Sequence, residues 1–291
     1  MCGRFTATWP SYDDLVRALG LQGNDDDRLL YKPRWNVAPT DPHWVVRLSA
    51  KAEERVLSPA SWGFLPGAGS GKGPSYPLIN ARAETVSKLP AFKASHAKRR
   101  CVVPIDGFYE WIGPPKARRP IWFHAPEGGL LRLAGLWEPA RRRDGGPEKE
   151  GRPEIEFTIL TTAANDVVAP AHDRMPVILA EKDVDAWLFA HEEEDARLFR
   201  PAPLDVLTGT AVGSRVNKIA HDDPNCLLPW DAEAEEAAAE HAAKEKREAR
   251  AAKRPAPKGA VKRTQGAEAK DGGAGETLSL FGESHGSRRR S

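Results

Sequence analysis

Cysteine is scarce in this 291-residue chain, and its three thiols, Cys2, Cys101 and Cys226, lie far apart. They form no CxxC pair and have no clustered histidines beside them, which excludes a disulfide framework and a zinc site. Long apolar runs are also absent. None approaches the ~18 residues of a membrane span, and no apolar signal-peptide core follows Met1. We therefore expect a cytoplasmic protein that holds no metal.

An excess of charge of one sign is lacking as well. The formal net charge is +2, and residues 1–230 carry 30 basic and 30 acidic side chains. Because the surface is not globally positive, we expect any nucleic acid to bind in a local basic groove. Beyond this part, 231–254 is dominated by alanine and charged residues, which predicts an exposed helix. Residues 255–291 form a basic tail with few apolar side chains, which predicts disorder.

Short apolar runs bounded by glycine and proline recur along residues 1–230, whereas long helical patterns are few and no βαβ alternation occurs. These features predict a single α+β domain around a curved, barrel-like sheet of mixed or antiparallel strands. Apolar residues at helical spacing predict a helix over 12–21 with Ser11 as its N-cap, followed by an acidic loop.

Two finer predictions concern the strands. Separate strands are expected at 55–57 and 61–64, because turn-rich residues flank each run. A hairpin is expected to join the strands at 121–124 and 130–137, because Pro126-Glu127-Gly128-Gly129 between them is typical of a tight turn.

Cys2 can become the first residue of the chain, because initiator methionine is normally removed when the next side chain is small. Cys2 would then carry a free α-amine and a thiol, with ordinary pKa values near ~8 and ~8.5. An aldehyde condenses with such an amine to an imine, and the thiol then closes a five-membered thiazolidine. This adduct is more durable than a simple Schiff base, so the pattern favours covalent capture of an aldehyde.

Three polar residues lie in apolar surroundings further along the chain. Glu110 is inside the aromatic run 108–111, where desolvation is expected to raise its pKa and suit it to proton transfer. Asn80 follows Leu78-Ile79 and can orient an amine or a sugar hydroxyl. His172 precedes an acidic residue that can tune it as an acid or base. Each of these residue types is also common as a structural polar group.

Eight motifs together resemble, in their order along the chain, those of the SOS-response-associated peptidase (SRAP) family. They are Met1-Cys2-Gly3-Arg4-Phe5, Asn36-Val37-Ala38-Pro39, Trp62-Gly63, Ile79-Asn80-Ala81-Arg82-Ala83-Glu84-Thr85, Gly107-Phe108-Tyr109-Glu110-Trp111, Ala134-Gly135-Leu136-Trp137, Thr161-Thr162-Ala163-Ala164 and His172-Asp173-Arg174-Met175-Pro176. The resemblance covers residues 2 to about 230 and leaves out the tail.

The resemblance implies a suicide DNA-repair protein that protects abasic sites in single-stranded DNA. It implies that Cys2 forms a thiazolidine cross-link with the ring-opened deoxyribose aldehyde, and that Asn80 orients the α-amine and the opened sugar. Glu110 would shuttle protons, and His172 would assist the sugar oxygen and a reversal or strand-cleaving lyase step. The peptidase label of the family implies that Cys2 has to be exposed, through self-cleavage after Met1 or otherwise.

DNA contacts are implied in the same way. Arg4, Arg82 and Arg174 match positions that hold flanking phosphates, while Pro39 and Trp111 match positions that pack against bases beside the lesion. Stacking of this kind is worth about 1 to 3 kcal/mol per base. Two other tryptophans of the motifs, Trp62 and Trp137, are assigned to core packing. The implied protein is a monomer associated with the nucleoid, without cofactor.

The tail contains one apolar cluster, Thr277-Leu278-Ser279-Leu280-Phe281. It resembles the bacterial sliding-clamp-binding pentapeptide of Gln-Leu-Ser-Leu-Phe type, with Leu278, Leu280 and Phe281 as anchors and Thr277 in place of glutamine. A chance cluster is the alternative. For the domain itself, the alternatives are an autoprocessing cysteine peptidase or amidohydrolase, and a module that binds nucleic acid without covalent chemistry.

Overall fold

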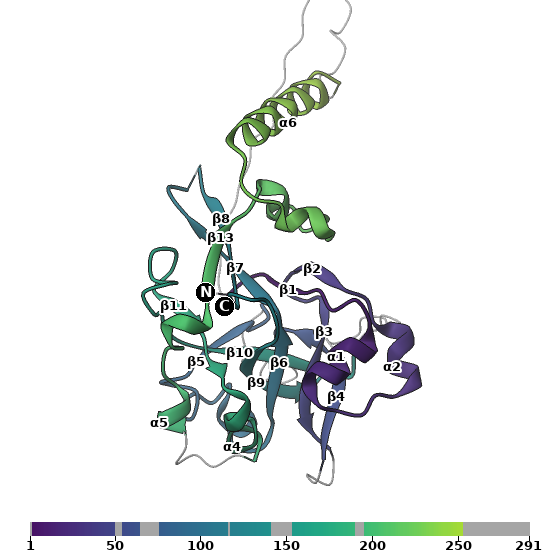
Figure 1. Cartoon of the computed structure of the whole chain (residues 1–291), viewed down its shortest axis with the longest axis vertical. Coiled ribbons are helices and arrows are strands. Elements are labelled where there is room, and N and C mark those ends of the chain that lie inside the picture. Colours follow the sequence, from purple (N-terminus) through teal and green to yellow (C-terminus); the bar gives the residue numbers. More distant parts are fainter. Residues whose placement is uncertain are drawn as a thin grey trace, which may run out of the picture. The chain divides into compact units, whose positions relative to one another are not determined.

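The computed structural model describes residues 2–49, 54–64, 76–115, 117–140, 153–189 and 195–252. The chain divides into two compact units, residues 1–242 and 243–291, and the first contains every described strand (Figure 1). These strands are β1 (Phe5–Ala7), β2 (Arg34–Val37), β3 (Pro42–Leu48), β4 (Arg55–Trp62), β5 (Asn80–Arg82), β6 (Arg100–Ile105), β7 (Gly107–Ile112), β8 (Arg119–His124), β9 (Leu131–Pro139), β10 (Ile155–Ala163), β11 (Arg174–Pro176), β12 (Ile178–Leu179) and β13 (Thr208–Ala211).

The described helices are fewer and mostly short. The α-helices are α1 (Tyr12–Leu19), α2 (Asp25–Leu30), α3 (Lys93–Lys98), α4 (Val184–Leu188), α5 (Asp195–Leu198) and α6 (Ala232–Ala252). Single 3₁₀ turns are η1 (Glu181–Asp183), η3 (Leu204–Val206), η4 (Ser214–Asn217) and η5 (Pro224–Leu227). None of the helices in the described ranges is long and apolar enough to span a membrane.

Five strands close into a ring. β4 pairs with β3, β3 with β6, β6 with β9 and β9 with β10, all antiparallel. β10 then returns to β4 through a parallel pairing of Glu156 with Ser61 and Phe157 with Trp62. Closure of this kind leaves no free sheet edge within the ring. The α+β fold around a barrel-like sheet that the sequence predicted is therefore confirmed.

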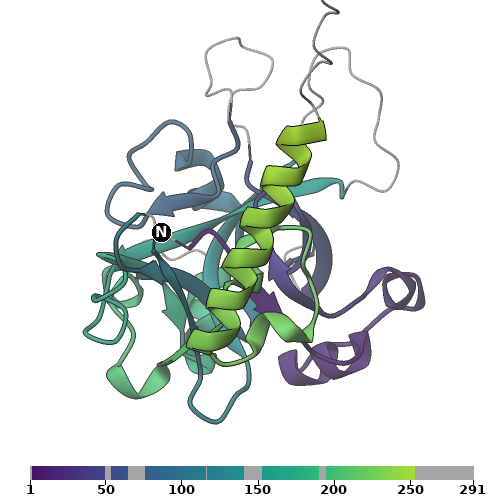
Figure 2. The same ribbon diagram turned by 90° about the horizontal axis from the view of Figure 1, so that it is seen from above.

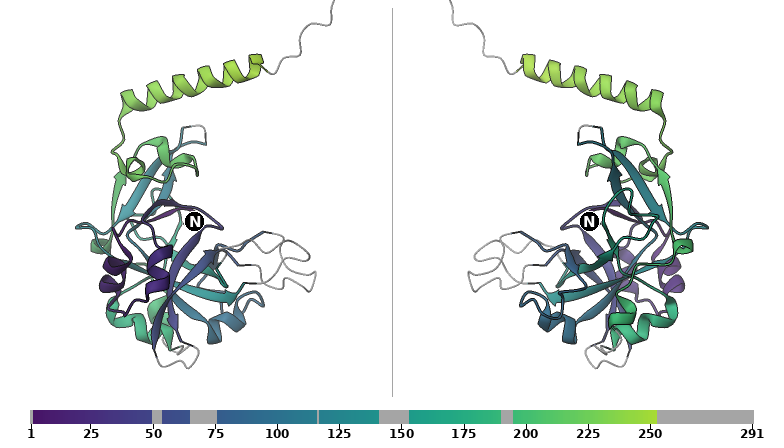
Figure 3. Two further views of the ribbon diagram at one scale, coloured as in Figure 1. Left: turned by 90° about the vertical axis from the view of Figure 1, so that its right-hand side faces the viewer. Right: turned by 90° about the vertical axis from the view of Figure 1, so that its left-hand side faces the viewer.

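A second sheet, in the order β13-β8-β7-β1-β2, lies beside the barrel, and Figure 3 shows β7, β8 and β13 standing above it. Only Asp106 separates the barrel strand β6 from β7. Its carboxylate accepts hydrogen bonds from the hydroxyls of Thr6 and Thr8 and from the Thr8 amide, which fixes β1 against the turn. As a result, the N-terminal strand runs beside β7, with Phe5 opposite Phe108.

The helix at 12–21 is confirmed, with an earlier end. α1 begins after Ser11, whose side chain accepts a hydrogen bond from the Asp14 amide, and it stops at Gly20 in the left-handed conformation (φ 64°). The acidic segment that follows is not a loop but contains α2, which packs beside α1 (Figure 2). Asn24 caps α2 by accepting from the Asp27 amide, and its acidic first turn suits the helix dipole.

Two strand predictions were wrong. β4 is one continuous strand across Pro59, because every residue of 55–61 finds a partner in β3. The strands β8 and β9 do not form a hairpin: β8 pairs with β7 and β13, whereas β9 pairs with β6, β10 and β12. The glycine-rich turn between them is a local feature. The two strands belong to different sheets.

Candidate active site

Cys2 and Asn80 are in direct contact. β5 lies along the barrel strand β10, with Asn80 opposite Ile159, and its side-chain amide donates to the Cys2 carbonyl oxygen at 2.8 Å. The Asn80 oxygen Oδ1 is buried and accepts no hydrogen bond from the residues that the structure describes. An amide held in this way has a free acceptor beside the main chain of Cys2, where an amine would lie.

Glu110 is close enough to Cys2 to influence it. Tyr109, its neighbour in β7, donates its amide hydrogen to the Arg4 carbonyl at 2.9 Å, which aligns Glu110 with the N-terminal residues. The prediction that Glu110 is desolvated is confirmed, because only 6% of its surface is exposed. Burial raises the pKa of the Cys2 thiol well above its usual range, and the charge of Glu110 raises it further.

Cys2 itself is enclosed. It has no exposed surface and packs in a core cluster with Phe5, Trp62 and Phe157, and its thiol faces the Arg4 carbonyl at 3.9 Å. In a chain that begins with Met1, the Cys2 nitrogen is a peptide amide and not an amine. The nitrogen that would attack an aldehyde first is therefore blocked. The thiol is protonated, because burial raises its pKa.

His172 lies on a separate turn between β10 and β11. Its Nδ1 accepts the Arg174 amide hydrogen at 2.9 Å and also lies 2.8 Å from Asp173 Oδ1. Both contacts converge on Nδ1, so they fix the orientation of the imidazole ring in this turn. Among the described residues, no hydrogen bond joins His172 to Cys2 or Asn80. The strand β10 connects them, because it precedes the turn of His172 and pairs with β5, which carries Asn80.

The predicted DNA contacts lie on several elements, and Arg4 and Trp111 both reach the segment after β13. Arg4 is half-buried, and its Nη1 donates to Asn36 Oδ1 at 2.8 Å and to the Val216 carbonyl at 2.9 Å. Burial lowers the pKa of Arg4 from its usual value. Trp111 is half-exposed and donates from Nε1 to Asn217 Oδ1 at 2.7 Å.

Arg82 and Arg174 lie on β5 and β11, which both pair with β10. Arg82 is exposed at the end of β5, and alternation along the strand puts its side chain on the same face as that of Asn80. Arg174 is engaged: two of its nitrogens donate to Glu84 at 2.6 and 2.8 Å, and it also donates to the Thr161 carbonyl at 2.5 Å. A phosphate at Arg174 would have to replace the Glu84 carboxylate, a partner that the sequence did not indicate.

The comparisons with known proteins agree with one another. The profile of the family described as "SOS response associated peptidase (SRAP)" matches residues 1–219. The chain belongs to this family.

Several proteins similar to this SRAP chain carry a functional name. The abasic site processing protein YoqW of Bacillus subtilis is 31% identical over 235 residues, which covers 78% of the chain and 99% of YoqW. The abasic site processing protein HMCES of Gallus gallus is 30% identical over 234 residues, which covers 68% and 67% of the two chains. A solved protein from Bacteroides thetaiotaomicron has the same fold, with a TM-score of 0.64 at 20% identity, covering 78% of the chain and 100% of its own.

Other predicted features of the SRAP chain can now be located. Trp62 is fully buried and donates to the Ile79 carbonyl at 3.0 Å, which fits the predicted packing role, while the half-buried Trp137 stacks under Arg47. Within the described ranges, no group of three or more His, Cys, Asp or Glu side chains is arranged to hold a metal ion. The motif Thr277-Leu278-Ser279-Leu280-Phe281 lies outside the described residues.

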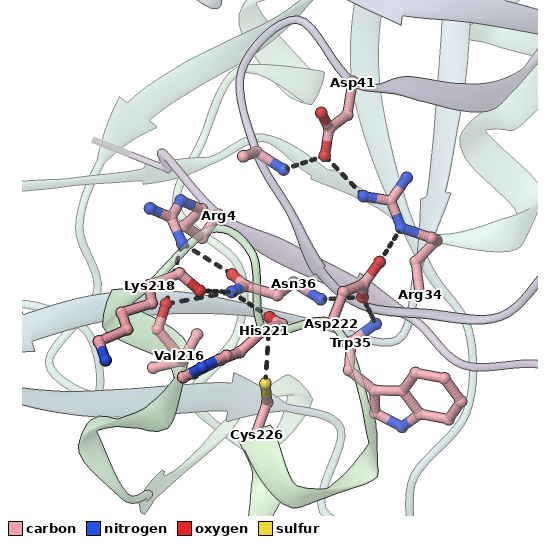
Figure 4. A network of polar contacts seen from close by, with 11 residues as sticks. Arg4, Arg34, Trp35, Asn36, Asp41, Val216, Lys218, His221, Asp222 and Cys226 are labelled. Carbon is pink, nitrogen blue, oxygen red and sulfur yellow. Dashed lines mark hydrogen bonds and ion pairs between the residues drawn. The ribbon is translucent and has the colours of Figure 1, made fainter.

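Sequence analysis assigned no role to the network that surrounds Arg4. Asn36 and Asp222 connect β2 with the segment after β13 (Figure 4), and Asn217 of that segment accepts a hydrogen bond from Trp111 in β7. Asn36 was visible as part of a family motif. The two others had no sequence signal, because polar residues in a turn-rich segment are common for many reasons.

Proposed function

We propose that this chain captures abasic sites in single-stranded DNA by a covalent bond to Cys2. The observation that carries the proposal is the contact of Asn80 with the Cys2 main chain at 2.8 Å, beside the buried carboxylate of Glu110. An amide, a carboxyl group and a cysteine at position two are the groups that thiazolidine formation needs. The names of the similar proteins support abasic DNA as the substrate.

The proposed reaction has two bond-forming steps. The Cys2 amine adds to the sugar aldehyde, and loss of one water gives an imine. The thiol then adds to the imine carbon, and its proton passes to the nitrogen, so the product retains every other atom. Glu110 receives and returns the protons, and the free Oδ1 of Asn80 accepts a hydrogen bond from the amine.

Removal of Met1 has to come first. It converts the Cys2 amide into an amine and takes away the residue next to it. The peptidase label of the family suits such a self-cleavage, and His172 is proposed to assist the sugar oxygen in ring opening and in an associated lyase or reversal step. The lyase and self-cleavage activities belong to this proposal.

Incubation with a single-stranded oligonucleotide that carries one abasic site tests the function. We expect a product that survives heat and denaturant, with a mass equal to protein without Met1 plus oligonucleotide minus one water. A peptidase or amidohydrolase would give no such band, and a non-covalent binding module would give a complex that denaturant dissociates. Either result would contradict covalent capture.

The roles of Glu110 and Arg82 predict opposite kinetic effects. Glu110→Gln keeps the shape but cannot transfer protons, so we expect cross-linking at saturating DNA to slow by about 100-fold with little change in DNA binding. Arg82→Ala removes an exposed cation, so we expect binding to weaken about 3- to 10-fold while the saturated rate changes little. Oligonucleotide titrations and single-turnover cross-linking measure the two effects. Equal losses of both properties in both variants would contradict the assigned roles.

A separate proposal concerns the tail and rests on its sequence. A short apolar segment in a basic, polar tail suits binding to a sliding clamp, with Leu278, Leu280 and Phe281 as anchors. A peptide of residues 272–285 should bind the clamp with a dissociation constant in the micromolar range, about 10 µM. The same peptide with Leu280 and Phe281 changed to alanine is the control. No binding at high micromolar concentration would end this proposal.

A further inference from the structure

Asn36 is a buried amide whose hydrogen bonds join three parts of the chain. It lies in β2 with no exposed surface. Its Oδ1 accepts from Arg4, and its Nδ2 donates to the carbonyls of Val216, Lys218 and His221 at 3.1, 3.1 and 2.7 Å (Figure 4). Both ends of the amide are therefore used, one toward the N-terminal strand and the other toward the segment that follows β13.

The three carbonyls lie on both sides of Asn217. This residue is exposed, and its side chain accepts the Trp111 indole hydrogen at 2.7 Å. Arg4 also donates to the Val216 carbonyl at 2.9 Å. Arg4 and Trp111 thus both form hydrogen bonds to the segment around Asn217. Asn36 also forms hydrogen bonds to this segment.

Asp222 secures the same segment from the other side. Its Oδ1 accepts the amide hydrogens of Trp35 and Asn36 at 2.6 and 2.9 Å, and its Oδ2 pairs with Arg34. Arg34 also forms an ion pair with Asp41 at 2.6 Å.

Asp41 closes the turn that carries Pro39. Its amide donates to the Ala38 carbonyl at 3.0 Å, and its carboxylate accepts the Ala38 amide hydrogen at 3.1 Å. Thr40 in this turn has a φ of 76°, a conformation that a β-branched residue adopts only when its surroundings hold it there.

We infer that Asn36 is a positioning residue for DNA binding, which sets Arg4 and, through the segment around Asn217, Trp111 in the arrangement that receives single-stranded DNA. The inference rests on the proposed function for the role of DNA, but it concerns recognition and not the covalent step. Asn36 touches no reacting atom. Its loss should therefore impair binding of any single strand, with or without an abasic site.

Asn36→Asp is the most informative substitution. It keeps an oxygen for Arg4 but places a second oxygen against three carbonyls, so the segment around Asn217 loses its hydrogen bonds to Asn36 while the side-chain volume is unchanged. Binding to a short unmodified single-stranded oligonucleotide should weaken about tenfold or more, the scale expected when several hydrogen bonds are lost together. The cross-linking rate at saturating abasic oligonucleotide should change less than about threefold, because Cys2, Asn80 and Glu110 are untouched.

Two further variants keep the test independent of folding. Asn217→Ala removes only the exposed acceptor of Trp111 and should weaken binding about three- to tenfold. In a double-mutant cycle with Trp111→Phe, which removes the indole hydrogen, the two losses should not add. Leu57→Ala opens a cavity in a core cluster that contains neither Cys2 nor Trp111. This variant is the control for lost thermal stability and should bind DNA normally.

The outcomes separate the inference from the proposed function. Weakened binding by Asn36→Asp in a protein that never cross-links supports the inference and refutes covalent capture. Normal binding by a folded Asn36→Asp variant, or fully additive losses in the cycle, overturns the inference even if the wild type cross-links. A wild-type protein that binds no single-stranded DNA overturns both.

Discussion

Replacing Cys2 with alanine should abolish the heat-stable product with abasic DNA, a loss of about 100-fold or more. Alanine leaves an α-amine after Met1 removal, so an imine can still form, but no thiol is present to close the ring. Cys2→Ser should behave in the same way in the heat assay, because its hydroxyl is a far weaker nucleophile. With both variants, borohydride should trap the imine as a stable amine, which denaturing gels and intact mass detect.

Cys101→Ala provides the matched control for Cys2. Cys101 is equally buried and belongs to the same core cluster, but it lies in β6 and is assigned no chemical role. This variant should cross-link at the wild-type rate after correction for folded protein. A heat-stable product from Cys2→Ala, or its loss from Cys101→Ala, would show that another group captures the DNA.

The largest stability effect is expected at Asp195. Its carboxylate pairs with Arg100 at 2.7 Å and with His96 at 2.8 Å, and the Arg100 side chain has no exposed surface. Arg100 also stacks over Trp187, so the guanidinium cannot turn toward water. Asp195→Ala removes a buried carboxylate that pairs with both Arg100 and His96 and should lower the free energy of unfolding by about 3 to 5 kcal/mol.

Urea unfolding of Asp195→Ala beside Asp185→Ala measures the effect. Asp185 pairs with Arg55, but 58% of its side chain is exposed, so removing it should cost only about 0 to 1 kcal/mol. Asp195 is at the start of α5 and joins this helix to the strand β6, which lies far away along the chain. Equal stabilities of the two variants would mean that solvent reaches Arg100 and compensates it.

Local features of the fold could be predicted from sequence. α1 has a capping serine, acidic residues in its first turn and glycine at its end, and all three act within a few residues. The short strands were recognisable from their apolar runs. Their partners were not, because β10 closes the ring with β4 across about 100 residues, and no short pattern contains such a pairing. The false hairpin between β8 and β9 has the same cause.

The candidate site divides in a similar way. Glu110 within an aromatic run indicated a desolvated carboxyl group, and it is buried. Asn80 was singled out for its apolar lead-in, and the structure joins it to Cys2. By contrast, the partners of Arg174 and Asn36 could not be predicted. Arg174 pairs with a single exposed Glu84, and Nδ2 of Asn36 donates to backbone carbonyls, which every residue type possesses.

The complete burial of Cys2 sets an order of events during synthesis. Its core neighbours include Phe157 and Met175, which leave the ribosome more than 100 residues after it. At ordinary elongation rates this delay is roughly 10 to 30 s, during which the start of the nascent chain has nothing to cover it. The proposed release of Met1 therefore has an early period in which a processing enzyme reaches the bond freely. Once the barrel has closed, Cys2 is buried among these side chains, and a separate processing enzyme reaches the bond less readily.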